Sequence, residues 1–298
     1  MPRDILADFV DRRPELARFQ RMLGGQSSKR ILLVTVEGEQ GKSCLLQRIF
    51  YECEQRRPPV HVALLDFDQR RSGLTDYLSV VREIRRYLRD ERVPAICACE
   101  DEITSLRSVV NIRTGGGSTA GVDFGKRSDF TDATVRDVAS RDLIQVSNVS
   151  EAPPSAALMA QQQDDMGRAL YRDLAALTPM RVALLLDTFE HASSGTCEWL
   201  ERWLFQPLRQ LPHVFLVVAG RPACRPFFAQ TRLWSGLLDI IDRFTPFSED
   251  DIQTHYHQRG IPISEMEWPV FLELARPNPM AMAQLGDLLE RARGGGAR

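Results

Sequence analysis

Apolar runs rich in valine, isoleucine and leucine alternate along the chain with helical patterns. Runs of this kind, with few polar positions, are typical of parallel strands that are buried on both faces. We predict strands at residues 30–36, 60–66, 181–187, 213–219 and 237–244. Between them, apolar residues three or four positions apart indicate crossover helices at residues 43–55, 74–90, 156–177 and 197–210. The predicted fold class is α/β, with a parallel five-stranded sheet covered by helices.

The pattern changes to helices alone after Phe247. Ser248 can cap a helix there, and Glu249 and Asp250 place acidic side chains in its first turn. Helical patterns cover residues 249–258, 264–275 and 279–293. We therefore expect two domains, a core over residues 1–246 and a helical lid subdomain over residues 247–298.

Residues 104–155 fit neither pattern, because glycine, serine, aspartate and asparagine interrupt short apolar pairs. We interpret this segment as an insertion in the core. A structureless loop of that length is unusual inside a compact domain. The insertion is therefore either disordered or a small β appendage.

Charge and composition exclude several classes of protein. The 38 lysines and arginines against 40 aspartates and glutamates leave a net charge of −2, so nonspecific nucleic-acid binding is disfavoured. The beginning of the chain resembles no signal peptide, and the apolar runs fall short of the ~20 residues of a membrane span. We expect a cytoplasmic protein that does not enter a membrane. The six cysteines lack paired spacing, so we interpret them as reduced thiols.

The string VEGEQGKS lies between the first predicted strand and the first predicted helix. This order of strand, glycine loop and helix is that of a phosphate-binding P-loop. Glycines let backbone N–H groups curl around phosphate oxygens, a lysine reaches the β and γ phosphates, and a serine hydroxyl binds Mg²⁺. The full pattern begins with glycine, where this chain has Val36, so an ordinary glycine turn is the alternative interpretation. The candidate nucleotide-binding residues are Gly38, Glu39, Gln40, Gly41, Lys42, Ser43 and Cys44.

Three further candidates follow predicted strands. Asp187 ends an apolar strand and is a candidate Mg²⁺ ligand together with Ser43, although an aspartate there can also cap a helix. Glu190 is a candidate for orienting the attacking water. Arg221 follows the next strand and could sense the γ phosphate, or it could be a surface turn residue.

A family resemblance rests on five segments in order, FVDRRPEL, VEGEQGKS, LLLDTFE, VVAGR and ARPNPMAM. Together they resemble the STAND class of AAA-related signal-transduction ATPases over nearly the whole chain. The first segment matches the class motif hhGRExE at Arg12 and Glu15, with Asp11 and Arg13 at the two positions that differ. The resemblance implies that Arg12 lies near the adenine and that Pro279 is the nucleotide-facing proline of the lid.

The resemblance also implies a function. It predicts a P-loop protein that binds ATP with Mg²⁺, hydrolyses it slowly, and acts as a molecular switch in bacterial signalling or defence. Its expected partners are further copies of itself or a separate effector protein. ATP is preferred to GTP because the guanine-reading string NKxD is absent from the sequence.

Two other functions remain open. The chain could hold nucleotide as an interaction scaffold without turnover, because Asp187 is followed by Thr188 and not by a second acid. A small-molecule or nucleotide kinase would also use a P-loop. The helical C-terminal segment and Arg221 argue against the kinase.

Overall fold

A computed structural model describes the chain at residues 12–38, 40–68, 73–107, 111–113, 119–121, 156–229, 234–261, 263–264, 268–275 and 279–294. The chain divides into two compact units. The first comprises Met1–Arg89 and Leu174–Arg298, and the second comprises Asp90–Asp173.

A five-stranded parallel sheet forms the centre of the first unit, as predicted. Its spatial order is β2-β5-β6-β1-β7, so β6 separates the strand before the glycine loop from the strand that ends in Asp187. The strands agree with the predicted ones to within one residue, except that the last is shorter. They are β1 (Ile31–Thr35), β2 (His61–Asp66), β5 (Val182–Asp187), β6 (Val214–Gly220) and β7 (Leu238–Ile241).

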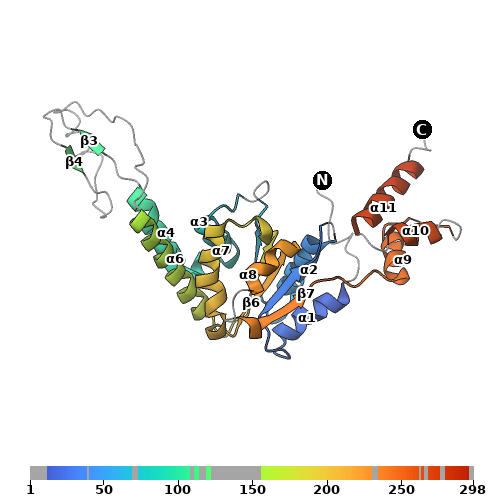
Figure 1. Ribbon diagram of the computed structural model, residues 1–298, viewed down its shortest axis with the longest axis horizontal. Helices are drawn as coiled ribbons and strands as arrows, with labels where there is room; N and C mark the ends of the chain where they lie inside the picture. The colour runs from blue at the N-terminus through green and yellow to red at the C-terminus, as the bar shows by residue number, and fades with distance from the viewer. Residues whose placement is uncertain are drawn as a thin grey trace. The chain divides into compact units, whose positions relative to one another are not determined.

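Helices cover both faces of this sheet. In Figure 1, α1 and α2 lie on one side of the strands, and α7 and α8 lie on the other. The helices of this layer arrangement are α1 (Arg13–Leu23), α2 (Lys42–Gln55), α3 (Tyr77–Leu88), α7 (Ser194–Leu200) and α8 (Arg225–Ala229). Short turns of 3-10 or π helix connect them, namely η2 (Phe189–His191), η3 (Glu201–Phe205), η4 (Gln206–Gln210), η5 (Pro222–Cys224) and η6 (Ser235–Leu237).

The hydrophobic core lies on both faces of the sheet. Every residue of β1, β5 and β6 is buried, and alternate side chains point to opposite faces. On one face, Leu32, Val34 and Val217 pack with Phe19 of α1 and Ile49 of α2. The buried strands therefore need apolar residues at every position, which is the pattern that the sequence carries.

Local capping moves several helix ends away from their predicted positions. The predicted helix 74–90 is α3, which starts at Tyr77 because Asp76 forms a capping box with Ser79. The predicted helix 197–210 starts earlier, at Ser194, where Ser193 accepts a hydrogen bond from the Thr196 N–H. It then continues as π and 3-10 turns. Helix α1 was not predicted from the apolar pattern.

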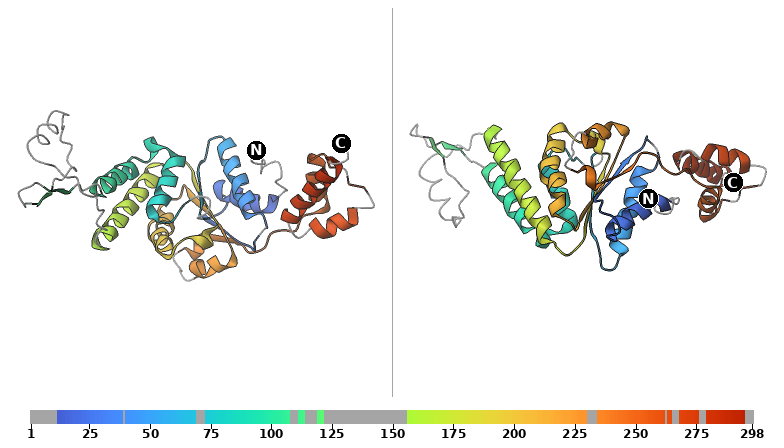
Figure 2. Two further views of the ribbon diagram at one scale, coloured as in Figure 1. Left: turned by 90° about the horizontal axis from the view of Figure 1, so that it is seen from above. Right: turned by 60° about the horizontal axis from the view of Figure 1, so that its bottom comes forward.

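The second unit contains a helical pair. It comprises η1 (Asp90–Arg92), α4 (Pro94–Arg107), β3 (Asn111–Arg113), β4 (Thr119–Gly121) and α6 (Ala156–Ala176) up to Asp173. Figures 1 and 2 show α4 and α6 side by side. The buried carboxylate of Asp173 accepts the N–H groups of Ala95 (3.1 Å) and Ile96 (2.8 Å), and so satisfies the first turn of α4.

The predicted insertion overlaps this second unit. Strands β3 and β4 form an antiparallel pair inside it, with Ile112 opposite Ala120. The remainder of the predicted insertion after α4 lies outside the described residues.

The C-terminal part is helical, as predicted, with α9 (Glu249–Gln258), α10 (Trp268–Ala275) and α11 (Pro279–Gly294). Ser248 caps α9 in a capping box with Asp251. Phe247, Ile252, Tyr256 and Met282 form a small separate core there. No helix in the described ranges is long and apolar enough to cross a bilayer.

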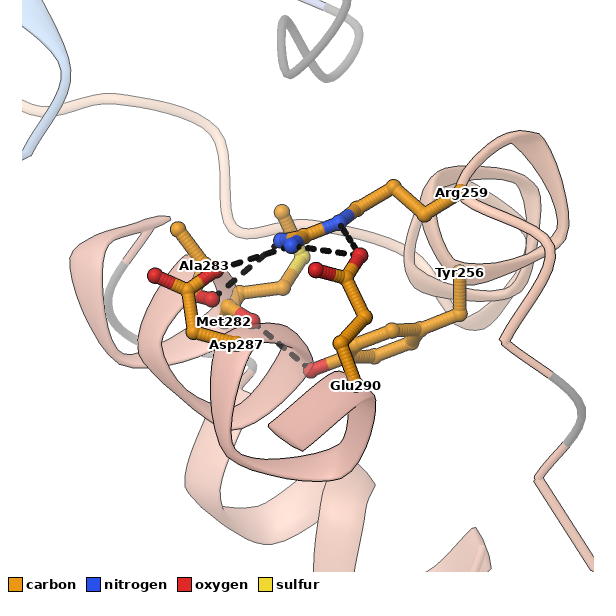
Figure 3. A network of polar contacts seen from close by, with 6 residues as sticks. All are labelled: Tyr256, Arg259, Met282, Ala283, Asp287 and Glu290. Carbon is orange, nitrogen blue, oxygen red and sulfur yellow. Dashed lines mark hydrogen bonds and ion pairs between the residues drawn. The ribbon is translucent and has the colours of Figure 1, made fainter. Parts of the chain in front are cut away.

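A buried arginine joins α9 to α11. The Arg259 side chain is 8% exposed, and its Nη2 lies 2.8 Å from both Asp287 Oδ1 and Glu290 Oε1. Its Nη1 donates to the carbonyl of Ala283 at 3.2 Å. Figure 3 shows the guanidinium lying across α11, with the Tyr256 hydroxyl bonded to the Met282 carbonyl nearby. The helix leaves room for it at Gly286, where a Cβ would lie 2.5 Å from Nη1.

This close approach predicts that the effect of Gly286→Ala depends on Arg259. With Arg259 replaced by alanine, Gly286→Ala should stabilise the chain by about 1 kcal/mol, because alanine favours a helix interior over glycine. With Arg259 intact, the added methyl group should displace the guanidinium and cancel that gain or reverse it. Urea unfolding of the four variants measures both effects. Equal effects of Gly286→Ala in the two backgrounds would contradict the packing described here.

Candidate functional site

The glycine loop lies at the carboxyl edge of the sheet, between β1 and α2. Gly41 is the N-cap of α2 and has a φ of 85°, a left-handed conformation that glycine adopts without a steric penalty. Lys42 and Ser43 then form the first turn of α2. The N–H groups of this turn, which have no partner inside the helix, give the loop end of α2 a partial positive charge.

Val36 stands where the P-loop pattern has its first glycine. Its side chain is 2% exposed and belongs to the core cluster that includes Leu45 and Leu46 of α2. The side chain that departs from the pattern therefore packs into the interior of the protein.

The Lys42 ammonium lies against the loop. Its Nζ donates to the carbonyls of Val36 at 2.9 Å and Glu37 at 2.7 Å. Partial burial lowers the pKa of Lys42, while the negative charges of Glu190 and Asp187 act in the opposite direction. The lysine is thus electrostatically coupled to both acidic candidates.

Asp187 lies beside Ser43 at the end of β5. It is 7% exposed, accepts a hydrogen bond from the Ser43 hydroxyl, and accepts the Thr188 N–H at 2.9 Å. Burial raises the pKa of Asp187, and the charges of Asp66 and Glu190 add to this. A serine hydroxyl next to a carboxylate supplies the hard oxygen ligands that Mg²⁺ prefers. Within the described ranges, no group of three or more His, Cys, Asp or Glu side chains is arranged to hold a metal ion by itself.

Glu190 and Arg221 are bonded to each other. The Arg221 N–H donates to Glu190 Oε2 at 3.1 Å, and Arg221 Nε lies 3.4 Å from Glu190 Oε1. Glu190 is mostly buried, whereas the Arg221 side chain is 63% exposed. A Cβ built on Gly38 would lie 3.8 Å from Arg221 Nη2, so the guanidinium lies next to the glycine loop. The structure therefore brings Gly38, Lys42, Asp187, Glu190 and Arg221 to one edge of the sheet.

Arg12 contacts the loop from another direction. Its buried guanidinium donates to the Gln40 carbonyl at 3.3 Å and to the Thr245 carbonyl at 2.6 Å. It also lies 4.4 Å and 4.1 Å from the ring centroids of Phe244 and Phe247. Burial lowers the pKa of Arg12, and the nearby charge of Glu15 opposes this effect. Arg12 thus joins the glycine loop to the segment that precedes α9.

The remaining candidates are less informative. Glu39 lies outside the described residues. Cys44 is half-buried in the first turn of α2, near enough to Arg12 to interact electrostatically with it. Pro279 begins α11, and its side chain lies outside the described part of the chain.

Sequence reasoning missed two residues at this edge. Asp66 ends β2 directly beside Asp187, and the signal that identified Asp187, a carboxylate at the end of an apolar strand, was present for it too. Arg225 donates from Nε to Thr35 Oγ1 at 2.8 Å and from Nη2 to the Thr35 carbonyl at 3.1 Å, at the start of the loop. Its position in a short helix after β6 carried no sequence signal.

A cleft of about 760 Å³ lies elsewhere, among α1, α2 and α9. Its lining includes Gln20, Arg48 and Asp250, and it does not include the lysine or the carboxylates described above. We place the candidate site at the glycine loop, since the groups that can bind phosphate and metal gather there.

Comparisons with known proteins identify the fold. No protein-family model and no curated protein matches the chain. A solved structure of a Walker-type ATPase of Pyrococcus abyssi matches it with a TM-score of 0.52 at 16% identity, over 96% of this chain and 69% of that one. Cdc6p from Pyrobaculum aerophilum matches it with a TM-score of 0.52 at 12% identity, over 99% of this chain and 65% of that one.

These likenesses confirm the predicted α/β fold, a parallel five-stranded sheet covered by helices. At such identities they show the fold alone, and they do not bear on the STAND class. They give no support to the exclusion of nucleic acid that the net charge suggested. The chain spans less than two thirds of Cdc6p.

Gly220 allows Glu190 to occupy its position. A Cβ at Gly220 would lie 2.9 Å from Glu190 Oε2 and 2.4 Å from Cys224 Sγ. Cys224 is buried, and its burial, together with the charge of Glu190, raises its pKa to about 12. Any side chain at Gly220 must therefore move the carboxylate or the thiol.

We expect Gly220→Ala to destabilise the protein by about 1–3 kcal/mol, because overpacking forces neighbouring groups to shift. Cys224→Ala should recover part of this loss, since it removes the nearer of the two atoms. Thermal unfolding measures both. Gly195→Ala is the matched control, because a Cβ there meets open space. If Gly220→Ala and Gly195→Ala have the same effect, the close packing of Glu190 is wrong.

Proposed function

We propose that the chain is a Mg²⁺-dependent ATPase that binds ATP, hydrolyses it slowly and acts as a molecular switch of the STAND type in bacterial signalling or defence. The observation that carries this proposal is the gathering of Lys42, Asp187, Glu190 and Arg221 around a glycine loop at one edge of the sheet. Each residue type matches one requirement of phosphoryl transfer, which depends on positioning and electrostatics.

The phosphates would bind at the loop and the first turn of α2. The N–H groups there would donate to an anion, and the left-handed Gly41 turns the chain into the helix. Lys42 would exchange the carbonyls of Val36 and Glu37 for phosphate oxygens, which are stronger partners because they carry charge.

Ser43 and Asp187 are the residues that would hold Mg²⁺. Their hydrogen bond already places a hydroxyl and a carboxylate side by side. A bound Mg²⁺ would neutralise charge on the β and γ phosphates. Asp187 is mostly buried, so its charge would act in a low-dielectric environment where a cation interacts with it strongly.

Glu190 would orient the attacking water, and Arg221 would contact the γ phosphate. In the structure these two side chains are paired, and Arg221 lies next to Gly38. A γ phosphate at the loop would compete with Glu190 for the exposed guanidinium. Binding of ATP would thus release a carboxylate oxygen for water.

The switch would act through Arg12. This residue bonds one carbonyl in the loop and one in the segment leading to α9, so a shift of Gln40 on nucleotide binding would be transmitted toward the C-terminal helices. We propose the core over residues 1–246 and the lid over residues 247–298 as the two moving parts. In the ATP state the chain would associate with further copies of itself or with an effector protein.

A nucleotide-held scaffold without turnover is the second candidate. Two observations favour it: Glu190 is engaged by both the backbone and the side chain of Arg221, and Thr188 follows Asp187. In this function the bound nucleotide would stabilise the fold and would not be hydrolysed.

Lys42→Ala tests the site itself. We expect it to weaken ATP binding about 10- to 100-fold, the cost of losing a charge-assisted hydrogen bond. Titration of ATP, ADP and GTP in the presence of Mg²⁺ measures this. Lys29→Ala is the matched control, since Lys29 precedes β1 at the opposite end of the strand and bonds the Gly236 carbonyl. Unchanged affinity in Lys42→Ala would refute the site.

Glu190→Gln separates the two candidate functions. The amide keeps the shape of the side chain and a hydrogen-bond acceptor, so ATP binding should persist, whereas phosphate release should fall about 100-fold or more. Glu198→Gln, an exposed change on α7, should leave both unchanged. If the unaltered protein binds ATP but releases no phosphate, the scaffold is the better description.

A further inference from the structure

A second carboxylate ends its strand beside Asp187. Strands β2 and β5 are parallel neighbours in register, so that Leu65 lies opposite Leu186 and Asp66 opposite Asp187. Both strands end there, and their carboxylates project from the same edge of the sheet as the glycine loop. Asp66 is held in place, because its Oδ1 accepts the Asp68 N–H at 2.9 Å.

Thr188 joins the two carboxylates. Its N–H donates to Asp187 Oδ1 at 2.9 Å, and its hydroxyl donates to Asp66 Oδ1 at 3.0 Å. Thr188 has a φ of 54°, in the left-handed region that β-branched residues rarely adopt. In this conformation the Thr188 N–H reaches Asp187 and the Thr188 hydroxyl reaches Asp66.

The charge arrangement suggests a role for this bridge. The charge of Asp66 lies close enough to raise the pKa of Asp187, so two acidic groups repel each other at one point of the sheet edge. A divalent cation at Asp187 would be attracted by both charges. The position after Asp187 holds Thr188 and not a second acid, so β5 contributes a single carboxylate at this point.

Building on the proposed function, we propose that Asp66 is a positioning residue of the Mg²⁺ site. Through Thr188 it fixes the orientation of Asp187, and it supplies from β2 the second negative charge that position 188 lacks. Asp66 acts through Thr188 and does not bind the metal directly. The hydroxyl of Thr188 is the necessary link.

The test is the Mg²⁺ dependence of ATP binding, measured by titration at a series of Mg²⁺ concentrations and in EDTA. Mg²⁺ should increase ATP affinity, and the half-point of this increase defines a Mg²⁺ concentration for each variant. In Asp66→Asn this concentration should be higher by about 10-fold or more, because the ligand Asp187 has lost a residue that positions it. Affinity in EDTA should stay as in the unaltered protein. Thr188→Val should reproduce the effect, and Thr188→Ser, which keeps the hydroxyl, should not.

The matched control is Asp242→Asn. Asp242 is an exposed acid just after β7, the strand at the opposite side of the sheet. The change Asp242→Asn therefore removes one negative charge without touching the bridge formed by Thr188. If Asp66→Asn shows the Mg²⁺ dependence of Asp242→Asn, the inference is wrong. Equal loss of affinity with and without Mg²⁺ also overturns it, because a general structural defect would have that effect.

Other outcomes are also decisive. Circular dichroism and thermal unfolding check that each variant folds, and if Asp66→Asn does not, the comparison of Thr188→Val with Thr188→Ser decides. If the unaltered protein binds no ATP in either condition, the proposed function fails and this inference fails with it. If the unaltered protein binds ATP and Asp66→Asn alone behaves normally, only the role of Asp66 is refuted.

Discussion

Parallel pairing of buried strands is the constraint on which the candidate site depends. Strands that run in the same direction and in register end at one edge of the sheet. Residues far apart in the sequence therefore meet at that edge because of the strand pairing. Lys42 follows β1, Asp187 ends β5, and Arg221 follows β6. The apolar packing that holds these strands together therefore also determines the distances among the charged groups.

Those charged groups have hydrogen-bond or ion-pair partners within the protein. Lys42 bonds loop carbonyls, Asp187 bonds Ser43, and Glu190 bonds Arg221. A buried polar group without partners costs free energy, so a site that exposes its binding groups only to phosphate would weaken the folded state. In the proposed function, each of these contacts would be exchanged for a contact with nucleotide, metal or water.

Three arginines outside the phosphate-binding groups also connect segments of the chain by hydrogen bonds. Arg12 donates to the Gln40 carbonyl in the glycine loop and to the Thr245 carbonyl in the segment before α9. Arg225 donates to Thr35 at the end of β1. Farther along, Arg259 fastens α9 to α11 across Gly286. Arginine serves all three positions because its planar fork can bond several acceptors at once.

The sequence by itself determined the strands, the glycine loop and the chemical types at the sheet edge, because hydrophobic period and strand-end polarity are local signals. The positions of Asp187 and Arg221 could be predicted in this way. The tertiary structure decided which of these groups touch. Only strand order and register set Asp66 opposite Asp187, pair Glu190 with Arg221, and direct Val36 into the core. These contacts depend on distances between chain segments that are tens to more than a hundred residues apart, or on the side that a buried residue faces. No local pattern encodes either.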